Sequence, residues 1–279
     1  MTPTEKTALP ERHASRFRHE LAAVGALWMR EFKVFQREKS RVFSSMAQPI
    51  LWILFIGSGF AATTELKDPR WAAVDYRAFM FPGVLAMSIL FGTIFYGLYI
   101  VWDRKMDVLK EVLVAPVHRT TIFFGKVIGG TTEAAIQAIV LIVVGFLATW
   151  ILPEWGFSLT VGGALLALVF SALLAIAFVS VGLCLGSFFE SLEGFQVIVS
   201  FLAFPLFFLS GALFPVDDLP GPMRVLTHLN PVTYAVDGLR GAILGAEFAA
   251  YPVWLDALVI GGFGAVMIAI GTWSFSRMR

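Results

Sequence analysis

Long apolar runs separated by short polar segments dominate the pattern of this chain. A helix that crosses a lipid bilayer needs about 20 mostly apolar residues. Six runs reach about that length, and they predict transmembrane helices at residues 42–62, 78–102, 127–150, 159–186, 195–213 and 254–275. The predicted fold class is therefore an all-α integral membrane protein with one membrane domain.

The segment before the first run divides into two parts. Residues 1–14 are polar, contain two prolines and show no periodicity, so we expect a mobile tail. Residues 15–41 place apolar side chains on one helical stripe and basic side chains opposite it, which predicts an amphipathic helix lying in the membrane interface. An amphipathic helix packed on a soluble domain is the less favoured alternative, because almost no soluble domain is left in the chain.

Two connecting segments are more structured than ordinary loops. Residues 103–119 mix apolar and charged positions and reach Pro116, which predicts a short amphipathic surface helix. Residues 214–245 stay apolar but carry prolines, glycines and charges, so we expect short helices folded back into one membrane face. Asn230 before Pro231 predicts a helix start, and Gly245 a helix end. Pro205 is expected to break the preceding helix.

Composition and charge support a membrane location. Apolar residues make up 58% of the chain, charged residues 15%, and the mean hydropathy is +0.78. Basic residues concentrate at both termini and in residues 103–126, so the positive-inside rule predicts cytoplasmic termini and an external 214–252 segment. We expect a bacterial inner membrane protein. The net charge of +1 argues against a nucleic-acid partner, and the single Cys184 excludes an internal disulfide.

Catalytic motifs are missing from the sequence. The one Gly-Lys pair, Gly125-Lys126, lacks the other residues of a phosphate-binding loop, and the four histidines show no metal-binding spacing. An intramembrane protease is a remote alternative, because Gly57-Ser58-Gly59 is not embedded in a nucleophile motif and reads better as small residues at a helix crossing. We therefore expect no enzyme activity, metal or cofactor in this chain.

Polar and aromatic residues inside the predicted spans are the candidates for a transport path or gate. The Glu133 carboxylate would be costly to bury in lipid, so it should face protein or water. The alternative for Glu133 and Gln137, which are one turn apart, is that they form an interhelical hydrogen-bonding pair. The aromatic residues suit an amphiphilic or glycan substrate, or else they face lipid. These candidates are Glu133, Gln137, Phe91, Phe95, Tyr99, Phe204 and Phe208.

Several spaced motifs carry a resemblance to a known family. They are Phe204-Pro205-Leu206, Leu209-Ser210-Gly211, Phe214-Pro215, Leu219-Pro220, Leu229-Asn230-Pro231 with Tyr234, Asp237 and Gly238-Leu239-Arg240, and Glu111-x-Leu-x-Ala-Pro-Val-x-Arg119 with Gly125-Lys126. On these residues the chain resembles the permeases of type-2 ATP-binding cassette exporters. This group includes daunorubicin-resistance, nodulation lipo-oligosaccharide and polysaccharide export permeases.

The resemblance implies an assembly and a division of labour. Such permeases form dimers, here expected to be homodimers, and each docks a separate ATPase chain, two copies in all, which binds ATP and Mg²⁺. Residues 103–119 would be similar to the coupling helix that contacts the ATPase. The coupling residues implied are Asp103, Arg104, Asp107, Lys110, Glu111, Leu113, Pro116 and Arg119.

The resemblance also implies that residues 214–245 form an external re-entrant hairpin over the exit. Its marked residues are Phe214, Pro215, Asn230, Pro231, Tyr234, Asp237 and Arg240. Asp237 and Arg240 are three apart on one predicted helix, and we interpret them as a structural pair in preference to cargo ligands.

The function predicted is outward movement of an amphiphilic, drug-like or lipid-like molecule, as in multidrug efflux, driven by the separate ATPase. Export of a polysaccharide or lipid-linked glycan by the same architecture is the alternative.

Overall fold

The computed structural model describes residues 9–62, 71, 74–106, 117–151, 159–216 and 219–277, and within these ranges all regular secondary structure is helical. The all-α fold class is thus confirmed. The helices are α1 (Leu9–Arg37), α2 (Lys39–Leu51), the π-helix η1 (Trp52–Gly57), α3 (Ser58–Ala61), α4 (Tyr76–Phe95), α5 (Leu98–Lys105), α7 (Arg119–Ile151), α8 (Val161–Phe188), α9 (Leu192–Phe208), α10 (Gly221–Leu229), α11 (Pro231–Leu244), the 3₁₀-helix η5 (Ala246–Phe248) and α12 (Val253–Arg277).

Five helical stretches in the described part of the chain are long and apolar enough to cross a membrane. They are Val42–Ala61, Tyr76–Lys105, Arg119–Ala148, Val161–Phe188 and Val253–Arg277. The chain is therefore a multi-pass membrane protein. The apolar helix α9 has 17 residues, about 26 Å at 1.5 Å per residue, so the count of six crossings stays a prediction.

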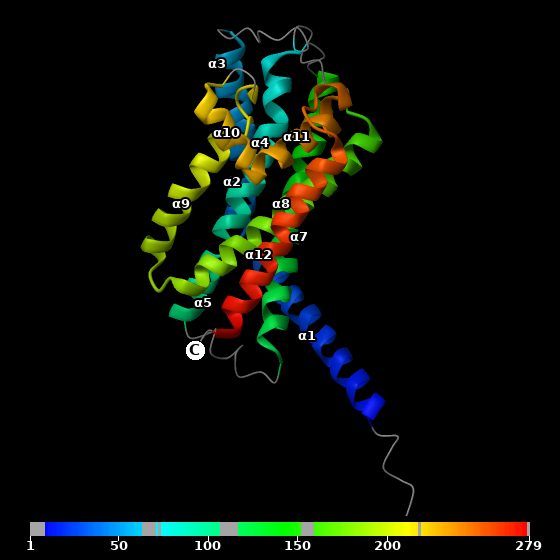
Figure 1. Ribbon diagram of the computed structural model, residues 1–279, viewed down its shortest axis with the longest axis vertical. Coiled ribbons are helices and arrows are strands. Elements are labelled where there is room, and N and C mark those ends of the chain that lie inside the picture. Colours follow the sequence, from blue (N-terminus) through cyan, green and yellow to red (C-terminus); the bar gives the residue numbers. More distant parts are fainter. Residues whose placement is uncertain are drawn as a thin grey trace, which may run out of the picture.

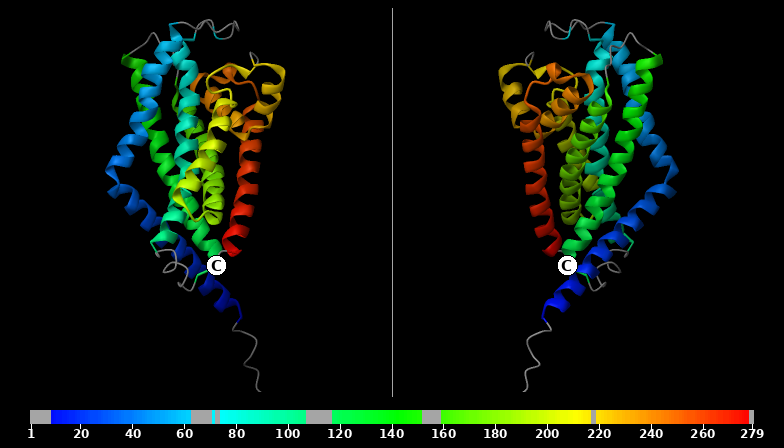
Figure 2. Two further views of the ribbon diagram at one scale, coloured as in Figure 1. Left: turned by 90° about the vertical axis from the view of Figure 1, so that its left-hand side faces the viewer. Right: turned by 90° about the vertical axis from the view of Figure 1, so that its right-hand side faces the viewer.

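The helices form an elongated bundle with two distinct ends (Figure 1). We call the end that holds α3, α10 and α11 the upper end, and the end where α5 and α12 finish the lower end. Helix α8 packs against α4, α7, α11 and α12. α9 runs between the two ends at the edge of the bundle, and α1 slants away from the lower end (Figures 1 and 2).

Backbone contact between glycines fixes one crossing in the centre of the bundle. A Cβ atom added to Gly97, at the start of α5, would lie 1.9 Å from the carbonyl oxygen of Gly182 on α8. No larger side chain fits there, and close approach of backbones is how helices without a hydrophobic driving force gain van der Waals contact in lipid. This crossing positions α5 against α8.

Two helix boundaries differ from the sequence-based expectation. Pro205 does not break α9, which continues to Phe208, because a proline near the end of a helix removes only one backbone hydrogen bond. α7 begins at Arg119 and not at 127, so Lys126 lies two turns inside the helix. The sequence pattern predicts a membrane boundary at Lys126 because this residue is charged. In the structure its ammonium group has partners inside the protein, so the helix continues through it.

The helix start predicted at Asn230 is confirmed. Its side-chain oxygen accepts a hydrogen bond from the backbone N–H of Val232 at 3.0 Å, and Pro231 is the first residue of α11. The helix ends at Gly245, which has a φ of 126°. Helices α10 and α11 thus form the two short pieces expected within 214–245.

Candidate functional site: an aromatic cavity and a buried charge cluster

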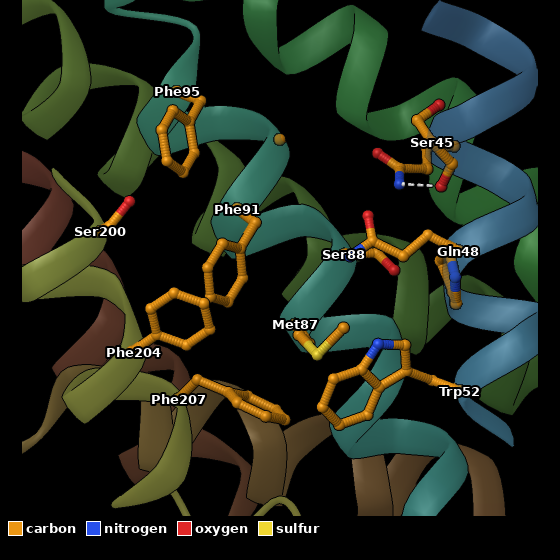
Figure 3. A pocket seen from close by; sticks show the side chains of 13 residues that line it. Ser45, Gln48, Trp52, Met87, Ser88, Phe91, Phe95, Ser200, Phe204 and Phe207 are labelled. Atoms are coloured by element: carbon orange, nitrogen blue, oxygen red, sulfur yellow. Dashed lines mark hydrogen bonds between the residues drawn. The ribbon is translucent and has the colours of Figure 1, made fainter. Parts of the chain in front are cut away.

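A cavity of about 450 Å³ lies between four helical segments (Figure 3). Its walls come from α2 with the start of η1, from α4, from α7 and from α9. Its lining is mostly apolar, with a few polar groups, and consists of Ser45, Gln48, Pro49, Trp52, Met87, Ser88, Phe91, Gly92, Phe95, Gln137, Ser200, Phe204 and Phe207. This composition is typical of a site for a small amphiphilic ligand.

The aromatic side chains of the cavity form one connected wall between α4 and α9. The ring of Phe91 lies 5.0 Å from Phe204 and 6.3 Å from Phe207, both edge-on, and 6.4 Å from Phe95. Trp52 meets Phe207 edge-on at 6.2 Å from the opposite side. Edge-to-face pairs of this kind hold ring orientations while leaving apolar faces free for a ligand.

A proline shapes the polar side of the cavity. Pro49 has no N–H, so the carbonyl of Ser45 one turn earlier cannot receive the usual helical hydrogen bond. The side-chain Nε2 of Gln137 on α7 donates to this carbonyl at 2.8 Å (Figure 3). The π-helix η1 begins three residues after Pro49. Gln137 therefore ties α7 to α2 where α2 departs from regular α-helical geometry.

The structure brings together four of the seven residues predicted for a path or gate. Phe91, Phe95, Gln137 and Phe204 all line the cavity. Phe208 stacks on Phe204 at 6.3 Å outside the described lining, and Tyr99 donates to Glu38, between α1 and α2, at 2.9 Å.

Glu133 is half-buried one turn from Gln137 on α7, and it is not part of the described lining of the cavity. The cavity is also lined by Trp52, Met87, Ser88, Ser200 and Phe207, which were not among the predicted path or gate residues. Serine, methionine and phenylalanine occur in most membrane helices, so their presence does not mark a cavity. Trp52 differs because it lies three residues after Pro49, and proline distorts a helix.

Four charged side chains from three helices meet near the lower end, and three of them, Glu31, Asp103 and Lys126, are buried, whereas Arg30 is 36% exposed. Lys126 on α7, 1% exposed, donates to Glu31 Oε1 of α1 at 3.2 Å and to Asp103 Oδ2 of α5 at 2.8 Å. Arg30 on α1 donates to the same two carboxylates, at 2.8 and 3.4 Å. The hydroxyl of Tyr96 donates to Glu31 Oε2 at 3.0 Å. We call Arg30, Glu31, Asp103 and Lys126 the charge cluster.

The cluster is neutral and internally satisfied. Both oxygens of each carboxylate accept a hydrogen bond, and two cations balance two anions. Removing one partner of a buried ion pair costs about 3–5 kcal/mol, because the remaining charge stays desolvated. The sequence did not reveal the cluster, since its members are far apart along the chain.

The predicted coupling residues divide into four groups. Asp107, Lys110, Glu111, Leu113 and Pro116 lie outside the described residues, together with the body of the predicted coupling helix. Asp103 faces inward, in the charge cluster. Arg104 donates to the carbonyls of Ser187 and Phe189, each at 3.0 Å, and so holds the end of α5 against the end of α8. Arg119 is the first residue of α7.

Further contacts join α1 to α7 beside the cluster. Trp28 Nε1 donates to Thr132 Oγ1 at 3.0 Å. Glu20 accepts hydrogen bonds from the Thr121 hydroxyl and the His118 backbone N–H, and the Thr121 bond is the main cause that holds the pKa of the Glu20 carboxyl below its usual value. α1 is thus attached along the lower half of α7.

At the upper end, Asp237 and Arg240 hold different backbone segments. Asp237 accepts from the backbone N–H groups of Ala250 and Tyr251 at 2.8–2.9 Å. Arg240, 5% exposed, donates to the Gly211 carbonyl at 2.8 Å and lies 4.3 Å over the ring of Phe79.

Burial lowers the pKa of Arg240 to about 10, and Asp237 opposes this shift. Arg240 therefore stays charged at neutral pH, and the contacts of both residues favour their interpretation as structural.

The remaining hairpin residues pack around these anchors. Phe214 meets Phe60 edge-on at 6.1 Å, and the Tyr234 hydroxyl donates to the His228 carbonyl at 2.9 Å. Asn230 Nδ2 donates to the carbonyls of Leu206 and Leu209 at 2.6 and 3.1 Å. Within the described ranges, no three His, Cys, Asp or Glu side chains gather in a group that could hold a metal ion.

Comparisons with known proteins agree with this architecture. A family model described as ABC-2 type transporter matches residues 22–244. The chain is 27% identical to Nodulation protein J of Rhizobium meliloti (strain 1021) over 236 residues, which cover 84% of this chain and 86% of that protein. It is 25% identical to the inner membrane transport permease YadH of Escherichia coli (strain K12) over 257 residues, with 89% and 90% covered. The chain belongs to the ABC-2 type transporter family and is similar to its transport permeases.

Proposed function

We propose that this chain is the permease subunit of an exporter that moves an amphiphilic small molecule outward across the bacterial inner membrane, driven by a separate ATPase that binds ATP and Mg²⁺. The observation that carries the proposal is the cavity between α2, α4, α7 and α9. Aromatic rings there would hold the apolar part of a cargo, and Ser45, Ser88 and Gln137 its polar part.

The size of the cavity favours a small cargo over a sugar chain. A volume of about 450 Å³ lies within the range of about 300–1,000 Å³ that accommodates drug-sized ligands. A lipid-linked glycan would need a continuous channel wide enough for several sugars. Glycan export by the same architecture is the second candidate.

The lower end supports the proposed ATPase partner. The segment 107–116 connects α5 to α7 there, and it carries the predicted coupling residues Glu111 and Leu113. Binding of ATP by the partner would displace this segment, and the permease would respond only as far as the two ATPase states contact it differently. Both described ends of the chain lie at the same end of the bundle (Figure 1), which suits cytoplasmic termini.

The test is ATP-dependent transport of rhodamine 6G, an amphiphilic dye, by vesicles that contain the permease and the ATPase that co-purifies with it. Replacing Trp52 by Ala should raise the KM for the dye on the order of tenfold, the effect of losing one or two aromatic contacts. Ser88→Trp should block transport by filling the cavity. Trp150→Ala is the matched control, because Trp150 is 77% exposed on α7.

Three outcomes separate the hypotheses. Transport by the purified permease without an ATPase would contradict the proposal. Equal effects of Trp52→Ala and Trp150→Ala would show that the cavity is not the path. No dye transport, together with loss of cell-surface glycan when the gene is deleted, would establish the second candidate.

A further inference from the structure

Two members of the charge cluster flank, along the chain, the segment that is proposed to contact the ATPase. Asp103 lies four residues before the segment 107–116, and Lys126 ten residues after it. The 2.8 Å ion pair between them joins α5 and α7, the two helices that flank this segment. A force that the segment applied to either helix would therefore act on this ion pair.

Two residues of α1 form ion pairs with the same two side chains, Asp103 and Lys126. Glu31 accepts from Lys126 at 3.2 Å, and Arg30 reaches Asp103 at 3.4 Å, so neighbouring residues of α1 hold both members of the pair. The hydroxyl of Tyr96, at the end of α4, adds a contact to Glu31 at 3.0 Å. Four helices, α1, α4, α5 and α7, thus meet at the cluster.

A cluster of buried charges is a poor way to gain stability but a good way to fix geometry. Desolvation offsets most of the attraction between buried charges, and well-packed apolar residues often stabilise as much. Hydrogen bonds between charged groups, in contrast, are directional and short. The presence of three buried charges where apolar side chains would hold the helices together therefore indicates a positional role.

We propose that the charge cluster is the joint through which movement of the segment 107–116 reaches α1, with Lys126 as its positioning residue. The proposal rests on the proposed function, because that function supplies the ATPase that moves the segment. α5, α7 and α1 then shift as one unit between the two ATPase states. α1 continues through Glu38 into α2, which lines the cavity, so the unit connects the ATPase contact to the cavity wall.

The test measures the distance between α1 and α5 in the assembled complex. Spin labels on cysteines replacing Leu21 of α1 and Trp102 of α5, which are 55% and 48% exposed, would be placed in a Cys184→Ser background. With the charge cluster intact, the complex should give one distance distribution that is the same without nucleotide and with trapped ATP. Such independence of state is what a rigid unit predicts.

The informative variant removes the three buried charges together, and the remaining Arg30 is 36% exposed and can reach water. The triple change Glu31→Gln, Asp103→Asn and Lys126→Met should still insert and bind the ATPase, but its α1 to α5 distance should shift when ATP is trapped. Lys126→Arg, which keeps the cation, should restore the state-independent distance. Asp75→Asn with Arg77→Met is the control, since it removes an ion pair at the upper end.

Each other outcome overturns an identifiable claim. A distance that changes with ATP while the cluster is intact, or one that stays constant in the triple variant, overturns the joint. Loss of ATPase binding in the triple variant alone would make the cluster a support for docking and would also overturn it. Failure of any ATPase to bind the unaltered permease would instead overturn the proposed function.

Discussion

At the scale of single residues, Asn230 shows how one side chain can hold several elements. Its oxygen caps α11, while its Nδ2 donates to two carbonyls at the end of α9, which the end of the helix leaves without helical partners. Asn230 is 5% exposed, so these groups would have no water to replace it. The cap was visible in the sequence, but the two contacts to α9 were not.

Replacing Asn230 by Ala should therefore cost more than the loss of an ordinary cap. We expect about 3 kcal/mol, from one cap and two buried hydrogen bonds, measured as unfolding free energy in detergent. Thr160→Ala is the matched control, because Thr160 caps α8 through one hydrogen bond to Gly163, and it should cost about 1 kcal/mol. Asn230→Asp keeps the oxygen that caps α11 but loses the N–H groups that donate to α9. If this variant were as stable as wild type, the contacts to α9 would not contribute to stability.

At the scale of elements, the packing of α1 on α7 depends on two glycines spaced four apart. A Cβ added to Gly125 would lie 2.7 Å from Leu27, and one added to Gly129 would lie 2.8 Å from Glu31. This small-xxx-small spacing lets the helix backbones approach closely. The approach brings Lys126, between the glycines, within reach of Glu31.

The Gly129→Ala variant should separate α1 from α7 and destabilise the protein. We expect a loss of about 1–3 kcal/mol from overpacking, although Ala favours a helix over Gly by about 1 kcal/mol. Gly262→Ala on α12 is the control, since a Cβ there meets nothing within 4 Å, and it should leave stability equal or slightly higher. Thermal unfolding of both purified variants measures the difference. Equal midpoints would show that α1 can move away from α7 without cost.

At the scale of the whole molecule, α9 leaves one of its faces uncovered by the rest of the described protein. It lies at the edge of the bundle (Figures 1 and 2) and exposes large apolar side chains, with Val197 67% and Phe201 81% exposed. The cavity is bounded on this side by α9 and α2. These features support the proposal that two copies of the chain pair across α9, with the cavities facing the shared interface.

A two-fold interface places equivalent residues opposite each other near its axis. A cysteine replacing Phe201, in the Cys184→Ser background, should therefore form a disulfide-linked dimer in membranes. Val266→Cys on α12, which is 54% exposed on a helix away from α9, should stay monomeric under the same oxidation. Non-reducing electrophoresis measures both. Dimers from the α12 position alone would place the interface elsewhere.

The sequence alone determined the features that depend on local pattern. Apolar run length determined the helical membrane class, with five long apolar stretches in the described part of the chain, and the Asn230-Pro231 pair determined the start of α11, because hydropathy and capping act over a few neighbouring residues. The spaced motifs identified the family. Local reading failed at two places for different reasons: Pro205 lies too close to the end of α9 to break it, and the charge partners of Lys126 lie on other helices.

Only the tertiary structure decided which residues share a site. Glu31 and Lys126 are 95 positions apart, and Ser45 and Gln137 are 92 apart. No periodicity connects such pairs, since their meeting depends on helix crossings set by glycines and close packing. For this reason the cavity took in Phe91, Phe204 and Gln137 but not Glu133. Asp103, expected to face an ATPase, pairs with Lys126 inside the protein.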